Sequence, residues 1–435
     1  MRNILFIAYY FPPLSGSGVQ KSLKFAKYLP EFGYRPIVLT VNPFYVRSKR
    51  DYQQLKELPE DTLIFRTPTF DWSWIFKLLW GLKLNKVVSW LQRNVLLPDP
   101  EISWLPFAKR KIKTILKRYP VKLAYISAGP FSSLLLGSWL KNMYHLDFVA
   151  DFRDEWTNNP LHLDNQYPAR SLQKERIWER QVLLACSALV FTIPQYMRAN
   201  FIAQYPFVAE KPYKEIPNGF DEADFANLPA VNAISHKKFT IVYAGTFYDR
   251  RQPEPLWQAI SDLFAQSVIP EDEIEFDIIG RNTPSFVLGK YKADPQICHA
   301  VKFKPAVSHK EVLLAQLQAD MLLLYIASGP NSEAELPGKL FDYLRSYKPI
   351  LAIIPENGIT ASILRQSKSA YIASSSDVSA ISDLLHAVFN LWKQGKLEIN
   401  PDKEYIKQFN RKDLTAQLAT LFDEIFEQMS NKGNP

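Results

Sequence analysis

The sequence predicts an α/β protein in which parallel strands alternate with helices in two domains. With 435 residues, 47% of them hydrophobic and 22% charged, the chain is long for one hydrophobic core and has enough apolar residues for two. Short uninterrupted apolar runs such as Ile350–Ile354 are typical of strands that are buried on both faces of a parallel sheet. Helical patterns separate these runs, as expected for strand–helix–strand units.

The predicted elements follow one another regularly. Apolar runs predict strands at Asn3–Tyr9, Arg35–Val41, Leu123–Ser127, Phe148–Phe152, Ala188–Ile193, Phe239–Thr246, Glu275–Arg281, Met321–Ile326 and Ile350–Ile354. Helical patterns occupy Val19–Phe32, Pro255–Phe264, the middle of Ser332–Pro355, Val378–Trp392 and Lys403–Met429. A linker expected at Ala226–Lys237 separates an N-terminal domain at 1–230 from a C-terminal domain at 236–400, and C-terminal helices follow at 401–430.

The loop after the first predicted strand is rich in glycine. Gly16 and Gly18 lie where backbone N–H groups at a helix N-terminus can bind a phosphate. A dehydrogenase is disfavoured because the loop is too long for the dinucleotide turn and Lys21 replaces the third glycine. In addition, Asn42 stands where an acidic residue would bind the ribose. A turn that serves only the fold is the alternative for the two glycines.

The net charge of +8 comes from one region. Residues 77–118 contain ten Lys and Arg residues but only two Asp and Glu residues. The rest of the chain therefore has 42 basic and 42 acidic residues and is balanced in charge. Five of the ten tryptophans lie in or beside this region, at Trp72, Trp74, Trp80, Trp90 and Trp104. This basic tryptophan-rich insertion, at about 70–120, suits a surface that meets anionic lipid. The alternatives are a solvated insertion whose aromatic residues pack inward and, less favoured, nucleic-acid binding, for which no known module is present.

Charged residues end the strand at Phe148–Phe152. Asp151 and Asp154 could accept a proton from an acceptor hydroxyl or hold it by hydrogen bonds, and we treat them as candidate catalytic residues. Arg153 is the third catalytic candidate, and it could bind a phosphate or stay paired to a carboxylate. This position, at the carboxyl end of a strand, is where open α/β sheets bind ligands. The alternative is a structural Asp–Arg network.

A second group of candidates follows the first strand of the C-terminal domain. Gly245 allows close backbone approach, and Thr246 follows it directly. Arg250 and Arg251 would neutralise a diphosphate through charge-assisted hydrogen bonds. A solvated arginine pair is the alternative.

The segment Ser332–Pro355 combines a helix with a strand. Pro337 suits the first turn of the helix, and Lys339 and Asp342 are three residues apart, so that they share a helix face. The loop before the helix, at 328–335, is rich in small and acidic residues and leaves helix N–H groups available to an anion. A solvated surface pair is the alternative for Lys339 and Asp342.

Five ordered segments resemble the retaining nucleotide-sugar glycosyltransferases of family four, which have two Rossmann-like domains in the GT-B arrangement. The segments are FPPLSGSGVQKSLKFAKYLPEFGY, DFRDEWT, IPNGFDE, VKFKPAVS and PGKLFDYLRSYKPILAI. The resemblance implies that Gly16 and Gly18 line the cleft for donor and acceptor, and that Arg250, Arg251 and Lys339 hold the donor diphosphate. Asp342 would bind the donor ribose in place of a family glutamate. The family's first glutamate falls on Ala334, so its role would pass to Glu333 or Glu335 or be absent.

The resemblance implies two facing, doubly wound domains with a C-terminal helix that crosses back to the first. It also implies transfer of a sugar from a nucleotide diphosphate-sugar to an acceptor hydroxyl, with retention of configuration and without a bound metal or other cofactor. We expect a glycan or lipid-linked acceptor in bacterial cell-surface polysaccharide synthesis, such as lipopolysaccharide or capsule. A non-catalytic module that binds nucleotide sugar or anionic lipid is the alternative.

Two sequence features bear on location and cofactors. The N-terminal run MRNILFIAYYFPP is too short for a secretory signal, and no apolar run reaches the ~18 residues that span a bilayer. The sequence has no metal-ligand spacing. We therefore expect a cytoplasmic protein, peripheral on the inner face of the membrane, with neither a metal nor nucleic acid as a partner.

Overall fold

The computed structural model describes residues 1–159, 167–226, 228–229, 237–247 and 252–432. The chain forms two compact units, Met1–Asn218 with Arg411–Pro435 (unit 1) and Gly219–Asn410 (unit 2). The boundary between the two units therefore lies before residue 230, where the N-terminal domain was predicted to end. The chain re-enters unit 1 at Arg411, after residue 400, where the C-terminal domain was predicted to end. Helix α9 (Glu222–Ala226) belongs to unit 2 because Glu222 accepts two hydrogen bonds from Arg345 Nε, at 2.7 and 2.8 Å. Most of the predicted linker lies outside the described residues.

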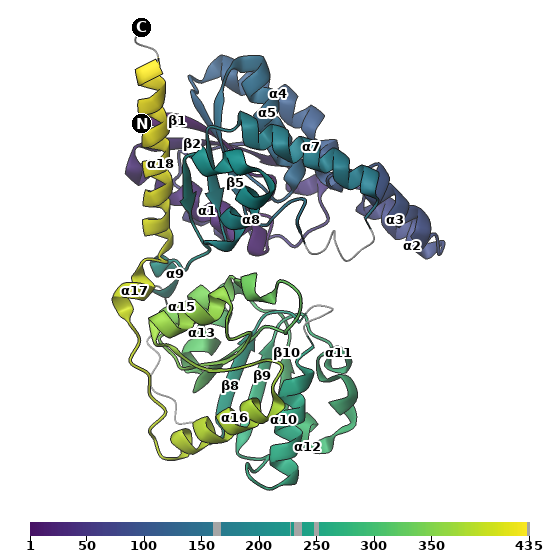
Figure 1. The fold of residues 1–435 in the computed structure, drawn as a ribbon, viewed down its shortest axis with the longest axis vertical. Coiled ribbons are helices and arrows are strands. Elements are labelled where there is room, and N and C mark those ends of the chain that lie inside the picture. Colours follow the sequence, from purple (N-terminus) through teal and green to yellow (C-terminus); the bar gives the residue numbers. More distant parts are fainter. Residues whose placement is uncertain (160–166, 227, 230–236, 248–251, 433–435) are drawn as a thin grey trace. The chain divides into compact units, whose positions relative to one another are not determined.

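Unit 1 contains a seven-stranded parallel sheet of order β3-β2-β1-β4-β5-β6-β7 (Figure 1). Its strands are β1 Arg2–Ile7, β2 Tyr34–Val41, β3 Leu63–Thr67, β4 Leu123–Ser127, β5 Asp147–Phe152, β6 Ala188–Phe191 and β7 Tyr213–Glu215. Its helices are α1 Ser17–Tyr28, α2 Ser73–Gly81, α3 Asn85–Asn94, α4 Leu105–Arg118, α5 Leu135–Tyr144, α7 Ala169–Ala185, α8 Tyr196–Gln204 and α18 Arg411–Lys432. The strand order reverses between β1 and β4, and such a reversal is where open α/β sheets bind ligands.

The two faces of this sheet are covered by different helices, which explains the uninterrupted apolar strands. Along β1, Leu5 and Ile7 pack with residues of α4, α5 and α7. Ile4 and Phe6 point to the opposite face and pack with α1 and α18. Since successive side chains of a strand point to opposite faces, both sets must be apolar.

Unit 2 contains a six-stranded parallel sheet of order β10-β9-β8-β11-β12-β13, surrounded by helices. Its strands are β8 Phe239–Ala244, β9 Ile274–Ile279, β10 Val301–Lys304, β11 Met321–Tyr325, β12 Ile350–Ile353 and β13 Ala370–Ala373. Besides α9, its helices are α10 Glu254–Ala265, α11 Pro284–Leu288, α12 Pro295–Ala300, α13 His309–Gln318, α14 Lys339–Ser346, α15 Ile359–Ser367, α16 Val378–Lys393 and α17 Lys403–Lys407. Here the strand order reverses between β8 and β11.

The C-terminal region differs in detail from its prediction. The helical pattern predicted at Lys403–Met429, within the C-terminal helices expected at 401–430, forms two helices, α17 and α18, which belong to different units. Leu414, Leu418 and Phe422 of α18 pack against unit 1 beside α1 and β1. The return of the last helix to the first domain, which the resemblance implied, is thus confirmed.

The basic tryptophan-rich insertion consists of two different parts. Helix α4 is an ordinary core helix, because Ile112 and Ile115 are buried against the sheet and Trp104, just before it, is fully buried. Helices α2 and α3 instead enclose a small separate cluster around Phe76 and Val88. Within the described residues, none of the helices is both long and apolar enough to cross a membrane.

Candidate functional site

The first candidate site is at the carboxyl ends of β8 and β9 in unit 2. Gly245 follows β8 with a φ of 140°, and its N–H donates to the carbonyl of Ile279 at 2.9 Å. The Asn282 side chain donates to the Gly245 carbonyl at 2.8 Å and accepts from the Phe247 N–H at 2.9 Å. A Cβ at Gly280 would overlap the Gly245 carbonyl oxygen. This turn therefore requires glycine at both positions and is held by Asn282, which the sequence analysis missed although it follows the Gly-Arg turn after β9.

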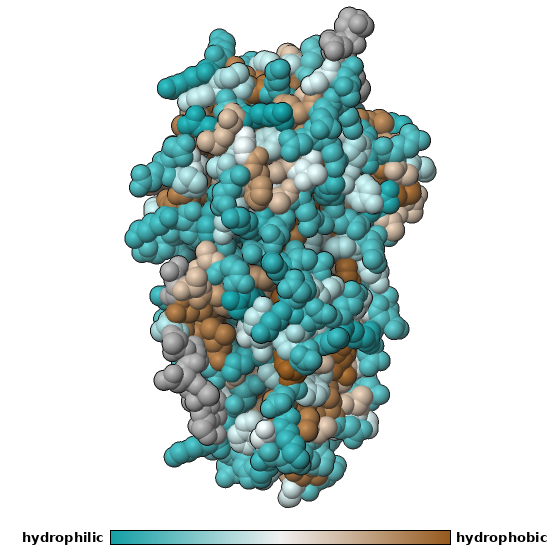
Figure 2. Space-filling model, turned by 90° about the vertical axis from the view of Figure 1, so that its left-hand side faces the viewer, coloured by the Kyte–Doolittle hydropathy of each residue, from teal (hydrophilic) through white to brown (hydrophobic). Residues whose placement is uncertain are grey.

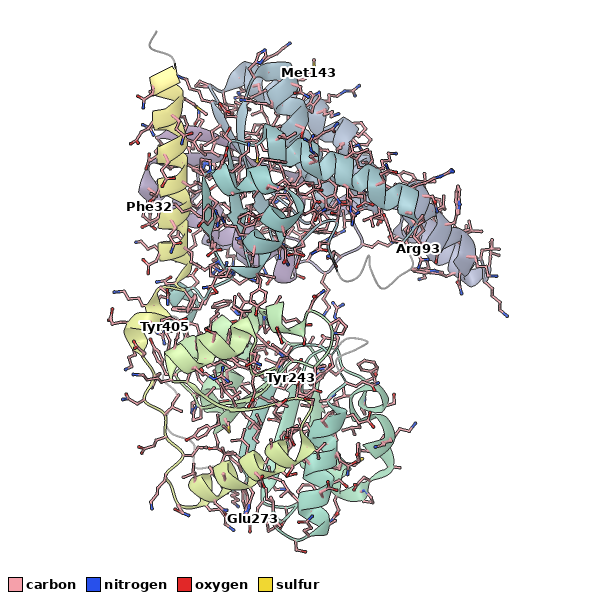
Figure 3. All side chains as sticks on the ribbon, in the orientation of Figure 1. Phe32, Arg93, Met143, Tyr243, Glu273 and Tyr405 are labelled. Atoms are coloured by element: carbon pink, nitrogen blue, oxygen red, sulfur yellow. The ribbon has the colours of Figure 1, made fainter. Side chains whose placement is uncertain are left out.

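Lys339 extends from the first residue of α14 toward this turn. Its Nζ lies 3.3 Å from the centre of the Tyr243 ring, and a Cβ at Gly245 would lie 3.4 Å from the same nitrogen. Tyr243, labelled in Figure 3, stacks on Phe247 with ring centres 4.0 Å apart. An ammonium over an aromatic face is held by cation–π attraction. The structure thus brings Lys339 and Gly245 together at the strand reversal, beside a helix N-terminus that also attracts anions.

Of the other predicted residues in this segment, one is described by the structure and two are not. Thr246 is half-buried next to Gly245. Arg250 and Arg251 lie outside the described residues, so their predicted contacts with a diphosphate stay predictions.

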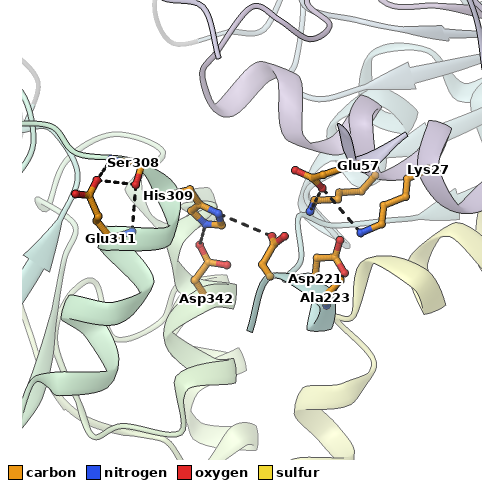
Figure 4. Close-up of polar contacts among 10 residues, drawn as sticks. Lys27, Glu57, Asp221, Ala223, Ser308, His309, Glu311 and Asp342 are labelled. Carbon is orange, nitrogen blue, oxygen red and sulfur yellow. Dashed lines mark hydrogen bonds and ion pairs between the residues drawn. The ribbon is translucent and has the colours of Figure 1, made fainter. Parts of the chain in front are cut away.

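Asp342, one turn farther along α14, contacts a histidine. His309 Nε2 lies 3.2 Å from Asp342 Oδ2, and its other ring nitrogen lies 3.8 Å from a carboxylate oxygen of Asp224 (Figure 4). His309 is the first residue of α13, which Ser308 and Glu311 cap reciprocally. The Asp342 side chain is 21% exposed, so its carboxylate is accessible to a further hydrogen-bond donor. No local pattern could reveal His309, because it precedes Asp342 by 33 residues.

Glu335 lies in the loop between β11 and α14. Its N–H donates to the Ser332 carbonyl at 3.2 Å, and its own carbonyl accepts from Thr360 Oγ1 at 2.6 Å. Glu333 is exposed, whereas Ala334 and Glu335 are half-buried. The backbone of this acidic loop is therefore fixed.

Asp151, at the end of β5, is a structural residue in this conformation. It is 0% exposed, and Oδ1 accepts from Lys21 Nζ at 2.9 Å, while Oδ2 accepts from the Tyr125 hydroxyl. Lys21 also donates to Thr192 Oγ1 at 2.7 Å, and burial lowers the pKa of Lys21 to about 8. In this conformation the enclosed carboxylate of Asp151 does not reach a substrate, so the catalytic role predicted for Asp151 stays a prediction. The structural network that the sequence left as an alternative is present, with lysine as the cation.

Arg153 and Gly18 lie together at the reversal between β1 and β4. Arg153 Nη1 donates to the Gly18 carbonyl at 2.8 Å, and a Cβ at Gly129, after β4, would lie 3.7 Å from the same nitrogen. Gly16 is exposed at the N-terminus of α1 with a φ of 137°, and Asp154 is exposed. A guanidinium near a helix N-terminus can bind a phosphate or a carboxylate.

Two carboxyl groups that the sequence analysis counted only as charges lie near the same strand ends. Glu101 accepts from the Tyr10 hydroxyl at 2.9 Å, and Asp99 accepts from the Ser132 N–H at 2.9 Å. Burial, together with the charge of Glu101, raises the pKa of Asp99 to about 7, and burial also raises the pKa of Glu101. Such a pair can hold a proton near neutral pH. The only sequence signal was that each of the two acids directly follows a proline, in the segment Pro98-Asp-Pro-Glu101.

The sequence matches no family model and no curated protein. Solved structures do resemble the chain. Sucrose-phosphate synthase from Thermosynechococcus elongatus is 14% identical with a TM-score of 0.58, over 98% of this chain and all of that one. WaaG, a glycosyltransferase involved in lipopolysaccharide biosynthesis, is 12% identical with a TM-score of 0.58, over 96% and 98%. UDP-GlcNAc 2-epimerase from Methanocaldococcus jannaschii is 11% identical with a TM-score of 0.52, over 98% and 100%.

These likenesses establish the fold, which is GT-B with two parallel sheets and surrounding helices, as the sequence predicted. One fold hosts several reactions, here both sugar transfer and epimerisation, so function must be argued from the residues of the site.

Proposed function

We propose that this protein is a glycosyltransferase that moves a sugar from a nucleotide diphosphate-sugar to a hydroxyl of an acceptor. The observation that carries the proposal is the position of Lys339, whose ammonium lies over Tyr243 and beside Gly245 at the strand reversal of unit 2. A departing nucleoside diphosphate gains negative charge in the transition state. A fixed ammonium at a helix N-terminus stabilises that charge without reorganisation.

The neighbouring residues fit the rest of such a donor. The accessible carboxylate of Asp342 suits the two hydroxyls of a ribose, because a carboxylate accepts two hydrogen bonds. Gly245 keeps the path to Lys339 open, since a side chain there would contact the ammonium. Glu335, in the fixed loop before α14, is the candidate for a contact with the sugar.

The finer parts of the proposal rest on the sequence resemblance. They are retention of configuration, no need for a bound metal, and an acceptor that is a glycan or is linked to a lipid. The setting would be bacterial cell-surface polysaccharide synthesis, on the inner face of the cytoplasmic membrane. The likeness to WaaG, a glycosyltransferase involved in lipopolysaccharide biosynthesis, supports that setting.

The test is release of nucleoside diphosphate from a panel of nucleotide sugars with hydroxyl-bearing acceptors, followed by analysis of the product. Lys339→Met and Asp342→Asn should each weaken donor binding or turnover by about tenfold or more, since each removes a charge-assisted contact of about 1.5–3 kcal/mol. Lys396→Met, at an exposed lysine after α16, removes the same charge away from the site and should change nothing.

Three outcomes would count against this assignment. Unchanged kinetics in both variants would exclude the site. Donor binding without release, for all acceptors, would favour the non-catalytic module, which the alanine at position 334 suggests. Conversion of a nucleotide sugar without any loss of its diphosphate would indicate an epimerase instead.

A further inference from the structure

The outer face of α2 and α3 exposes apolar side chains at a higher density than the rest of the described chain. Trp74, Trp80 and Trp90 are 48%, 53% and 57% exposed. Of the twenty large hydrophobic residues exposed in the described part of the chain, eight lie within 74–95; the other five are Leu78, Leu82, Leu84, Val87 and Val95. Scattered exposed apolar residues are ordinary, but a contiguous group of this kind marks an interaction surface.

This face belongs to a folded element. Phe76, Val88 and Leu96 form a buried cluster between the two helices, and Trp72 packs against it. The start of α2 is fixed by Asp71, which accepts from the Ser73 N–H at 2.9 Å and from its hydroxyl at 2.8 Å. The apolar inner face of the two helices is therefore buried in this small core. The outer tryptophans do not belong to the core and remain exposed.

The charges on this element select its partner. Residues 72–98 contain Lys77, Lys83, Lys86 and Arg93 but no acid, and the three lysines are exposed. Tryptophan prefers the bilayer–water interface, and lysine extends its ammonium to anionic headgroups while its stem stays apolar. Protein–protein interfaces, by contrast, are depleted in lysine. We propose that the outer face of α2 and α3 inserts into the headgroup region of an anionic lipid bilayer.

The geometry limits this contact to the surface. Helices of 9 and 10 residues are each about 15 Å long at 1.5 Å per residue, about half of the bilayer's hydrocarbon thickness. Figure 1 shows α2 and α3 at the side of unit 1 opposite α18, and Figure 2 shows that the α18 side carries mostly hydrophilic residues with scattered apolar ones. Arg93, labelled in Figure 3, marks the projecting element. The α2–α3 face of unit 1 is thus suited to a contact with the lipid surface.

This inference deepens the proposed function, because an enzyme bound to a membrane surface would meet a lipid-linked acceptor there. It rests on the proposed function only for the identity of that acceptor. The experiment is independent of catalysis. The full-length protein is mixed with vesicles of phosphatidylcholine alone or with added phosphatidylglycerol, and binding is followed by flotation and by the blue shift of tryptophan emission. We expect binding to the anionic vesicles that weakens with salt.

Two pairs of substitutions locate the contact. Lys83→Gln with Lys86→Gln should weaken binding by about 30-fold, because each charge contributes about 1 kcal/mol at an anionic surface and tenfold is about 1.4 kcal/mol. Lys113→Gln with Lys117→Gln, on exposed positions of α4, removes the same charge and should have a clearly smaller effect.

Trp80→Ala with Trp90→Ala should weaken binding and reduce the blue shift, since only Trp74 of the three outer tryptophans remains, whereas Phe44→Ala, at an exposed aromatic residue elsewhere, should leave binding intact. Equal binding to both vesicle types, or equal losses from the two lysine pairs, would overturn the inference. The inference would also be overturned if the protein failed to bind vesicles and instead self-associated, and if the tryptophan substitutions removed that self-association.

Discussion

Removing one member of the buried Lys21–Asp151 pair should destabilise unit 1 far more than removing both. The two side chains are fully buried and 2.9 Å apart. Lys21→Met leaves a carboxylate without its cation, and Asp151→Leu leaves an ammonium without its anion. Each should cost about 3–5 kcal/mol, whereas the double variant, in which neither charge is buried, should lose much less. The single losses should therefore be strongly non-additive.

The assay is urea unfolding of the full chain, followed by tryptophan fluorescence and circular dichroism, with the unit 1 transition fitted for the two single variants and the double variant. The matched control is the Lys214–Glu424 pair, also in unit 1 and 2.8 Å apart but partly exposed, where loss of either partner should cost about 1 kcal/mol or less. If Asp151→Leu kept full stability and abolished sugar transfer, the structural assignment of Asp151 would be wrong.

Two further predictions concern pH and the donor site. The folded pKa of Asp99 is raised from 3.8 to about 7, so its contribution to stability is complete below about pH 4 and is lost as the pH rises through 7. The loss is at most about 4 kcal/mol, and Asp99→Asn should flatten the pH dependence measured by urea unfolding; an unchanged slope would contradict the raised pKa. Tyr243→Leu should weaken donor binding about two- to thirtyfold by removing the aromatic face below Lys339, while Tyr243→Phe keeps that face and should bind normally in a calorimetric titration; equal losses in both variants would refute this role.

Local sequence features were enough to predict the fold class and nine of the described strands, but not β3, β7, β10 and β13. The apolar run at Ile350–Ile354 and the turn at Gly33, which ends the 3-10 helix Leu29–Phe32 after α1, are features of local chemistry. An uninterrupted apolar run and the left-handed conformation of Gly33, with a φ of 84°, depend on a few neighbouring residues. Gly245 and Lys339 were also singled out as candidates from the sequence, because a glycine after a strand and a lysine at a helix start have direct physical meaning.

Which distant residues come into contact became known only from the folded structure. Asp151 lies at a strand end that commonly binds ligands, yet Lys21, 130 residues away, encloses it. His309 contacts Asp342 across 33 residues, and Trp104 turns inward whereas Trp74, Trp80 and Trp90 turn outward. Such outcomes depend on the order of strands and on which helix covers which face. These are long-range properties of the packed chain. The periodicity of a short stretch of sequence contains no information about them.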